Sequence, residues 1–121
     1  MNVVNPIGKA GENIAAEYLK KHGYKILERN FQGKQGEIDI ISIKDNVLVF
    51  VEVKTRRSVQ FGTPLEAIRH AKLDAILLTA GYYTATHHNL PSQQRIDAIA
   101  VILDEKLTPI SVEHMENISG F

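Results

Sequence analysis

The sequence predicts an α/β domain in which a mixed sheet and two helices follow one another in the order αβββαββ. Apolar residues recur at helical spacing near the N-terminus and again after residue 64, and short apolar runs bounded by turn residues occupy the rest of the chain. A strand, helix and strand order in the second half implies a right-handed crossover, with helices packed against the sheet. With 121 residues and 44% hydrophobic content, residues 1–121 are expected to form a single domain.

The first helix is expected to begin at Asn5-Pro6 and to end at His22-Gly23, because proline favours the first helical turn and glycine favours the end. Its apolar stripe comprises Ile7, Ala10, Ile14, Ala15, Tyr18 and Leu19. Residues 24–31 then read as the first strand, and the polar residues 32–36 as a loop into the next one.

Residues 36–55 read as a β-hairpin closed by the polar cluster Lys44-Asp45-Asn46. A two-residue loop at Asp45-Asn46, or a four-residue loop at 44–47, sets Asp39 opposite Glu52 and Glu37 opposite Lys54. The apolar face that results carries Ile38, Ile40, Val47, Val49, Val51 and Val53.

A three-residue loop would instead oppose Asp39 to Val51 and turn Glu52 to the other face, since a slip of one residue turns a strand over. The nearly unbroken apolar face favours the first register. On the other face, that register places apolar residues at the turn end, and Glu37, Asp39, Glu52 and Lys54 at the far end.

A capping box with proline at the first helical position, at residues 63–66, predicts the start of the second helix, which ends before Asn89. Residues 96–103 read as a strongly apolar strand. Residues 107–112 read as a final strand that Pro109 confines to an edge of the sheet.

The charged end of the hairpin is the candidate functional site. Asp39 and Glu52 on directly opposed positions would lie close enough to share a divalent cation, which would offset their repulsion. Lys54 follows Glu52 by two residues on the same face. The alternative is a solvated ladder of ion pairs. Because the second arm is apolar on both faces until Glu52, it reads as a central strand, which favours the cation site.

These residues resemble the PD-(D/E)xK nuclease superfamily, with Asp39 on one strand and Glu52-Val53-Lys54 on the next. Further motifs are the segments 36–39 and 49–56, Phe61-Gly62, Arg95-Ile96-Asp97, and Glu12 in the first helix. Together they look like the signature of the YraN family of small bacterial proteins, which is similar to archaeal Holliday junction resolvases. Ile38 stands where the superfamily motif has proline. The resemblance implies a restriction-endonuclease-like core.

The resemblance also implies a set of metal ligands. Asp39 and Glu52, with a backbone carbonyl near Val53, would hold Mg²⁺ or Mn²⁺, because these cations prefer oxygen ligands. Glu12 is expected either to help hold the metal or a second one, or to be a solvated helical residue. Lys54 would orient a metal-bound water or neutralise a phosphate.

The charge balance is neutral, with 14 basic and 14 acidic residues. Nucleic-acid binding would therefore need segregated charge, for which Arg56, Arg57, Arg69 and Lys72 are the candidates, and it should depend steeply on salt. The alternative is that they are solvated. The chain has no cysteine and no apolar run long enough to span a bilayer, which favours a cytoplasmic protein without a membrane partner.

The sequence hypothesis is therefore a metal-dependent endonuclease acting on DNA, including branched or structured DNA, in the form of a homodimer as the resolvase resemblance suggests. The alternative is a nuclease-like module that binds nucleic acid or protein with little or no turnover. A structural scaffold is the third reading. Arg95 and Asp97 read equally as an intrachain pair or a phosphate contact, and His87-His88 as the charged or solvated end of a helix.

Overall fold

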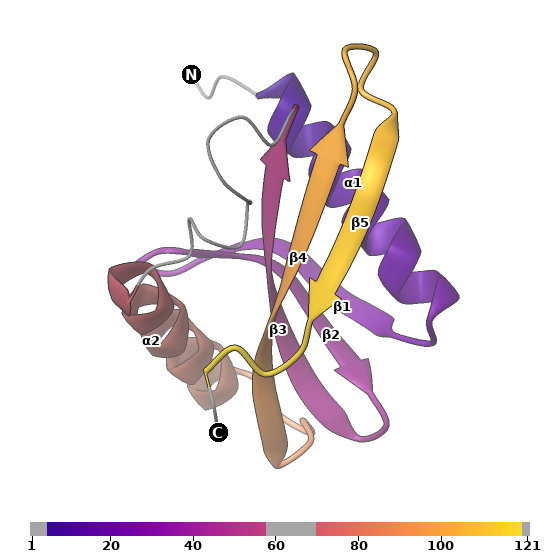
Figure 1. Cartoon of the computed structure of the whole chain (residues 1–121). Helices are drawn as coiled ribbons and strands as arrows, with labels where there is room; N and C mark the ends of the chain where they lie inside the picture. The colour runs from indigo at the N-terminus through magenta and orange to yellow at the C-terminus, as the bar shows by residue number, and fades with distance from the viewer. Residues whose placement is uncertain (1–4, 58–69, 120–121) are drawn as a thin grey trace.

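The computed structural model describes residues 5–57 and 70–119, which form one five-stranded sheet with a helix against each face. The strands lie in the sheet in chain order, β1-β2-β3-β4-β5 (Figure 1). β1, β2 and β3 are antiparallel, β3 and β4 are parallel, and β4 and β5 are antiparallel. The predicted mixed sheet and the order αβββαββ are confirmed.

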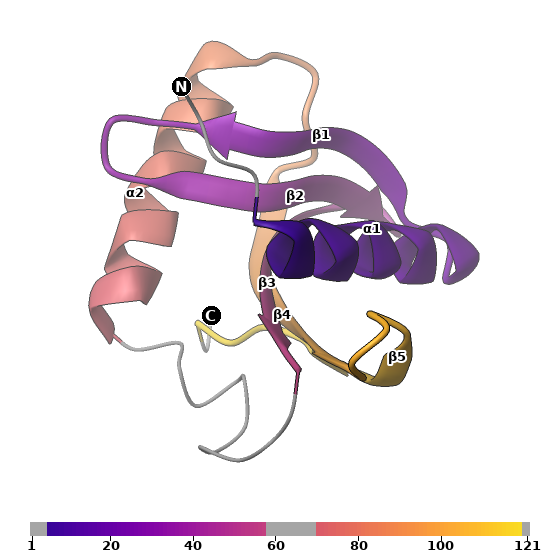
Figure 2. The same cartoon turned by 90° about the horizontal axis from the view of Figure 1, so that it is seen from above.

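Helix α1 (Pro6–Lys21) begins and ends where the sequence predicted. The side chain of Asn5 caps it by accepting hydrogen bonds from the backbone N–H groups of Ile7 and Gly8, at 3.0 and 3.4 Å. Its buried face, which includes Ala15 and Leu19, packs on the sheet beside β3 and β4. Figure 2 shows α1 across one face of the sheet, with α2 on the opposite side.

Strands β1 (Lys25–Gln32), β2 (Glu37–Lys44) and β3 (Val47–Arg56) form an antiparallel meander. Asp45 and Asn46 both have positive φ, 50° and 61°, as a two-residue hairpin turn requires. Lys44 therefore pairs with Val47, and the ladder runs on to Ile40 opposite Val51. The first of the registers considered from the sequence is confirmed along this part of the hairpin.

Helix α2 (His70–Thr86) connects β3 to the parallel strand β4 (Gln93–Leu103). The predicted helix start at residues 63–66 lies outside the described residues, as does Phe61-Gly62 of the family signature. Strand β5 (Pro109–Met115) is an edge strand as predicted, but it begins two residues later and ends three residues later than expected. The later end brings His114 into a hydrogen bond with Asp97 of β4, at 2.7 Å.

Two hydrophobic clusters occupy the two faces of the sheet. The cluster under α1 includes Ile40, Val49 and Val51, as predicted. Ile38 was expected on that face, but it packs under α2 instead. The reason lies in β1, where Asn30 has a positive φ of 55° that breaks the alternation, and Phe31, which pairs with Ile38, turns toward α2 with it.

No helix within residues 5–57 or 70–119 is both long enough and apolar enough to cross a membrane.

Candidate functional site

The candidate site lies in a fork where β2 and β3 separate. The ladder between them ends at Ile40 and Val51, and beyond this pair the two strands diverge, as Figures 1 and 2 both show. The expected ladder pairs Asp39–Glu52 and Glu37–Lys54 are therefore not formed. Glu37 instead pairs with Gln32 of β1, whose side-chain amide donates to the Glu37 carboxylate at 3.0 Å.

Asp39 bridges the start of the fork. Its Oδ2 accepts a hydrogen bond from the backbone N–H of Val53 at 2.7 Å, so the side chain takes the place that a backbone carbonyl of β2 would have in a continued ladder. This hydrogen bond holds the carboxylate against β3, one residue from Glu52. Asp39 thus lies near Glu52 because of this hydrogen bond to Val53, and not through the ladder pair that the sequence predicted.

The pKa of Asp39 is raised to about 7. Burial is the largest cause and the charge of Glu52 the next, and smaller contributions come from Glu12 and Glu37. The hydrogen bond from Val53 acts in the opposite direction without offsetting them. The four carboxylates thus lie close enough to disfavour the charged form of Asp39.

Glu52 belongs to the central strand β3, and only 4% of it is exposed. Its Oε1 lies 3.2 Å from the ammonium Nζ of Lys72 in α2, whereas its buried Oε2 has no hydrogen-bond partner among residues 5–57 and 70–119. Burial raises the pKa of Glu52, and the ammonium groups of Lys72 and Lys54 act against that rise. A buried carboxylate with one free oxygen is costly unless a further donor or cation reaches it.

Glu12 is brought to the site by a close approach of α1 to β3. A Cβ atom on Gly11 would lie 2.7 and 2.8 Å from Cγ2 and Cβ of Thr55, so the helix reaches this distance only with glycine there. Glu12 follows directly. Its Oε1 is buried without a hydrogen-bond partner, and its charge contributes to the raised pKa of Asp39.

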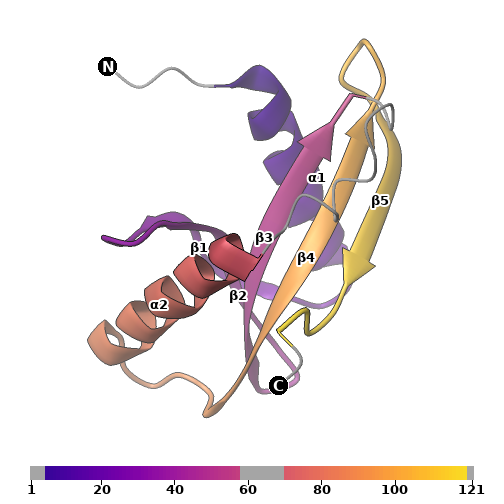
Figure 3. The same cartoon turned by 60° about the vertical axis from the view of Figure 1, so that its left-hand side comes forward.

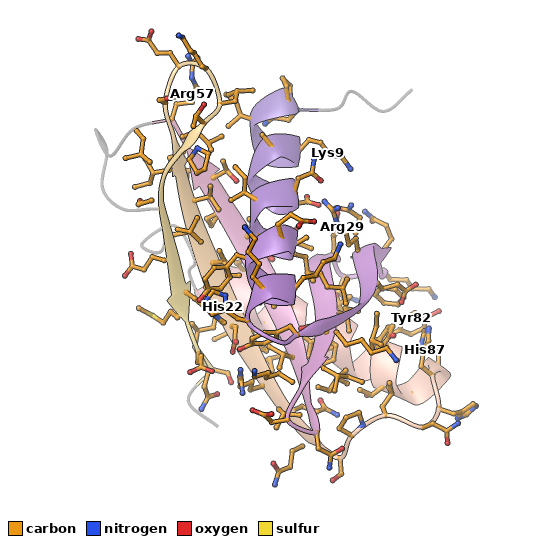
Figure 4. The ribbon with its side chains drawn as sticks, turned by 90° about the vertical axis from the view of Figure 1, so that its right-hand side faces the viewer. Lys9, His22, Arg29, Arg57, Tyr82 and His87 are labelled. Atoms are coloured by element: carbon orange, nitrogen blue, oxygen red, sulfur yellow. The ribbon has the colours of Figure 1, made fainter. Side chains whose placement is uncertain are left out.

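Arg29 of β1 is a neighbour of the site that the sequence reasoning missed. Its Nη2 lies 3.6 Å from Oε1 of Glu12 and donates a hydrogen bond to Oδ1 of Asn13 at 2.8 Å. Figure 4 shows Arg29 reaching across to α1 from the edge strand. A charged residue in the middle of a half-buried strand was the available signal. Arg29 ties the helix to the sheet at the level of Glu12.

Lys54 and Val53 occupy the β3 arm of the fork. Lys54 is partly buried and forms no ion pair within the described residues, and its charge lowers the pKa of Glu52. Val53 is buried, and its N–H is used by Asp39. The use of the backbone carbonyl near Val53 as a metal ligand stays a prediction.

The donors at the fork suit a hard divalent cation. Asp39 and Glu52 supply carboxylate oxygens at a place with excess negative charge, and Oε2 of Glu52 lacks a partner. Within residues 5–57 and 70–119, no three or more His, Asp and Glu side chains are grouped closely enough to hold a metal by themselves. Water would have to complete the coordination, as is usual for Mg²⁺ in proteins.

The candidate basic residues divide into different environments. Arg56 and Arg57 are exposed, and Arg57 donates to the backbone oxygen of Glu105 at 3.4 Å near the β4–β5 turn, where Figure 4 labels it. Lys72 is paired with Glu52. Arg69 lies outside the described residues.

Arg95 and Asp97 form an intrachain network. Asp97 is fully buried, and its carboxylate receives hydrogen bonds from Arg95 Nε at 3.0 Å, His114 Nε2 at 2.7 Å and the N–H of Asn117 at 2.9 Å. Burial raises the pKa of Asp97, but these hydrogen bonds outweigh it and the pKa is lowered. Arg95 also reaches Glu116 at 2.8 Å. The network fastens β5 and the residues after it to β4.

His87 and His88 lie at the end of α2. The ring of His87 stacks on Tyr83, with 3.9 Å between centroids, and its Nδ1 lies 2.9 Å from the backbone oxygen of Tyr83. His87 also lies 3.9 Å from Glu28 of β1, and Figure 4 shows it beside Tyr82, away from Arg29. His88 is exposed. His87 therefore joins the end of α2 to β1, and Figure 4 shows it away from Arg29 and the site.

Comparison with known proteins identifies the family. The model of a family described as "Uncharacterised protein family UPF0102" matches residues 11–101. The chain belongs to the UPF0102 family. This confirms the membership of the YraN family that the hairpin motifs indicated. The span matched by the UPF0102 model contains Glu12, Asp39, Glu52 and Lys54 and ends before β5 begins.

Relatives in other bacteria align along nearly the whole chain. A UPF0102 protein of Caldanaerobacter subterraneus is 51% identical over 112 residues, which is 92% of each chain. One of Flavobacterium psychrophilum is 41% identical over 93% of this chain and 92% of its own, and one of Chloroherpeton thalassium is 39% identical over 98% and 92%. The UPF0102 domain and this chain thus have similar lengths.

Proposed function

We propose that this UPF0102 protein is a Mg²⁺- or Mn²⁺-dependent phosphodiester hydrolase, an endonuclease that acts on DNA. One observation supports it above the others: the partly buried Asp39 and the buried Glu52 lie at the fork between β2 and β3, close enough for the charge of Glu52 to raise the pKa of Asp39. A purely structural role would have favoured apolar residues at such a place, since paired buried carboxylates are destabilising. The resemblance to PD-(D/E)xK nucleases supports the same reading.

Each residue of the fork has a distinct role in this proposal. Val53 orients the Asp39 carboxylate through its N–H, and the central strand β3 holds Glu52 in place. Lys54 orients the attacking water or neutralises the scissile phosphate. A bound cation would lower the pKa of that water and would stabilise negative charge on the phosphate. Glu12 helps to hold this cation, through water, or a second one, and Arg29 keeps Glu12 in position.

Arginine side chains are the proposed contacts to the DNA backbone. Arg56 and Arg57 are exposed and would contact phosphates, for which Arg57 would give up its hydrogen bond to Glu105, and Arg69 is assigned the same role from the sequence. The resolvase resemblance favours branched DNA as the substrate and a homodimer that presents two sites. The absence of cysteine favours the cytoplasm. Sedimentation velocity at high protein concentration tests the dimer, and a single monomeric species would exclude it.

The direct test incubates the wild type, Asp39→Ala and Lys54→Ala with single-stranded, duplex and branched DNA in Mg²⁺ or Mn²⁺. Lys20→Ala is a matched control, because it removes a lysine from an exposed pair with Glu17 on α1. We expect cleavage by the wild type and the control, and none by the other two. Cleavage by the wild type no faster than by Asp39→Ala and Lys54→Ala would remove the catalytic proposal.

A second candidate is a nuclease-like module that binds nucleic acid or protein without turnover. The ion pair between Lys72 and Glu52 favours it, because an internal cation already occupies one oxygen of a proposed metal ligand. Metal titration separates the two. A wild type that binds DNA but neither Mg²⁺ nor Mn²⁺ would be such a module.

A further inference from the structure

The ion pair between α2 and β3 is unusual in its two partners. Glu52 is fixed in a central strand and 4% exposed, whereas the Lys72 side chain is 41% exposed. Their closest charged atoms are 3.2 Å apart. Lysine carries its charge on a flexible four-carbon stem, so Lys72 can move into water while Glu52 cannot. Within the described residues, Lys72 is the base that forms an ion pair with Glu52.

The ammonium group lies against the carboxylate that a divalent cation at the fork would have to reach. A cation shared by Asp39 and Glu52 must come within bonding distance of the Glu52 carboxylate, whose Oε1 is held by Lys72 and whose Oε2 has no hydrogen-bond partner. An ammonium and a divalent cation on one carboxylate repel each other, because both carry positive charge and the site is largely buried. The two therefore compete for Glu52.

We propose that Lys72 is a built-in counter-ion of the metal site, which neutralises Glu52 in the metal-free protein and must leave Oε1 when a divalent cation binds. The inference rests on the proposed function, because it assumes that the fork takes Mg²⁺ or Mn²⁺. It assigns Lys72 a role different from the phosphate contact expected from the sequence. Without metal, the Lys72 side chain of α2 thus occupies one oxygen of Glu52. The affinity of the fork for a divalent cation is therefore lower than the carboxylates alone would give.

The test is calorimetric titration of Mn²⁺ into the full chain. An opposite charge at this distance shifts the pKa of a carboxylate by about one to three units, which measures how strongly the two charges interact. A divalent cation that must displace Lys72 has to overcome an interaction of this size. Removal of the lysine charge should therefore tighten Mn²⁺ binding about tenfold or more. We expect this in Lys72→Met and Lys72→Gln, and wild-type affinity in Lys72→Arg, which keeps the charge. Lys20→Met, which breaks the exposed Lys20–Glu17 pair, is the matched control and should bind Mn²⁺ as the wild type does.

Two further measurements tie the effect to this site. Asp39→Asn added to Lys72→Met should abolish the gain in affinity. Thermal melts without metal should show Lys72→Met less stable than the wild type, because Glu52 is left buried and unpaired, and Mn²⁺ should close that difference. Lys72→Gln keeps an amide donor toward Glu52 and serves if Lys72→Met does not fold, as judged by circular dichroism.

The outcomes are distinguishable. A wild type that binds Mn²⁺, together with Lys72→Met and Lys72→Gln variants that bind it no more tightly, overturns the inference and leaves the proposed function standing. Weaker binding in these variants also overturns it, since Lys72 would then support the cation. Absence of Mn²⁺ binding in the wild type and in every variant removes the proposed function and the inference together.

Discussion

Replacement of Asp39 by asparagine should stabilise the metal-free protein at neutral and alkaline pH. The pKa of Asp39 is about 7 in the folded chain, against an ordinary value of 3.8 that applies to the unfolded chain. The folded state therefore holds a proton that the unfolded state has lost. The contribution of Asp39 to stability is fully present below about pH 4, is lost as the pH rises from about 4 to about 7, and stays lost at higher pH. The difference of about three units between the folded and unfolded pKa of Asp39 corresponds to a loss of at most about 4 kcal/mol in the free energy of unfolding.

The assay is urea unfolding of the wild type and Asp39→Asn at pH values from 5 to 8, in the presence of a chelator. Asparagine keeps an oxygen that can accept the hydrogen bond from Val53, so it removes the charge with little change in shape. The variant should exceed the wild type by about 2 to 4 kcal/mol at pH 8, and by less at pH 5. Asp74→Asn on the exposed face of α2 is the control and should change little. A wild type as stable as Asp39→Asn at pH 8, or a gap that shrinks as the pH rises, would refute the reasoning.

Three more predictions follow from the packing and the charges. Gly11→Ala should lower the free energy of unfolding by about 1 to 3 kcal/mol in thermal melts, because the new methyl group meets Thr55. Its control is Gly81→Ala in α2, where the new methyl group meets no described atom within 4 Å, so this change should stabilise the protein by up to about 1 kcal/mol. Equal effects of the two changes would contradict the close approach of α1 to β3. Asp97→Ala should lower the free energy of unfolding, measured in urea, by about 3 to 5 kcal/mol. Because the pKa of Asp97 is lowered in the folded protein, the stabilisation that Asp97 contributes should be lost on acidification. A loss of less than about 1 kcal/mol in Asp97→Ala would mean that the network is not stabilising. The affinity for Mn²⁺, measured by calorimetry, should fall by up to about tenfold per pH unit as the pH drops below 7, because Asp39 must lose its proton to act as a ligand. An affinity that does not change with pH would exclude Asp39 as a ligand.

Much of the fold could be read from the sequence because short-range patterns determine it. The cap at Asn5-Pro6, the turn at Asp45-Asn46 and the alternation along β3 depend on neighbours in the chain, and each is found where expected. Ile38 was assigned to the wrong face, because Ile38 and Ile40 are two residues apart but pack on opposite faces of the sheet, and the sequence of β2 gives no sign of this break.

The site was found in outline, and its contacts could not be. The motif indicated Asp39, Glu52 and Lys54, but the point at which a ladder ends depends on how the sheet twists, so the hydrogen bond from Val53 to Asp39 had no sequence signal. The pairing of Lys72 with Glu52 depends in turn on how α2 lies on the sheet, a long-range property. Figure 3 shows this helix running beside the β2–β3 region, at an angle to the strands.

The central claim is that the fork between β2 and β3 holds a divalent cation on Asp39 and Glu52. Crystals soaked in Mn²⁺ and measured for anomalous scattering test it most directly. We expect a strong anomalous peak between the two carboxylates, with Lys72 displaced from Glu52, and no such peak in crystals of Asp39→Asn. A map without a peak in the fork at saturating Mn²⁺, or with peaks at other residues alone, would contradict it.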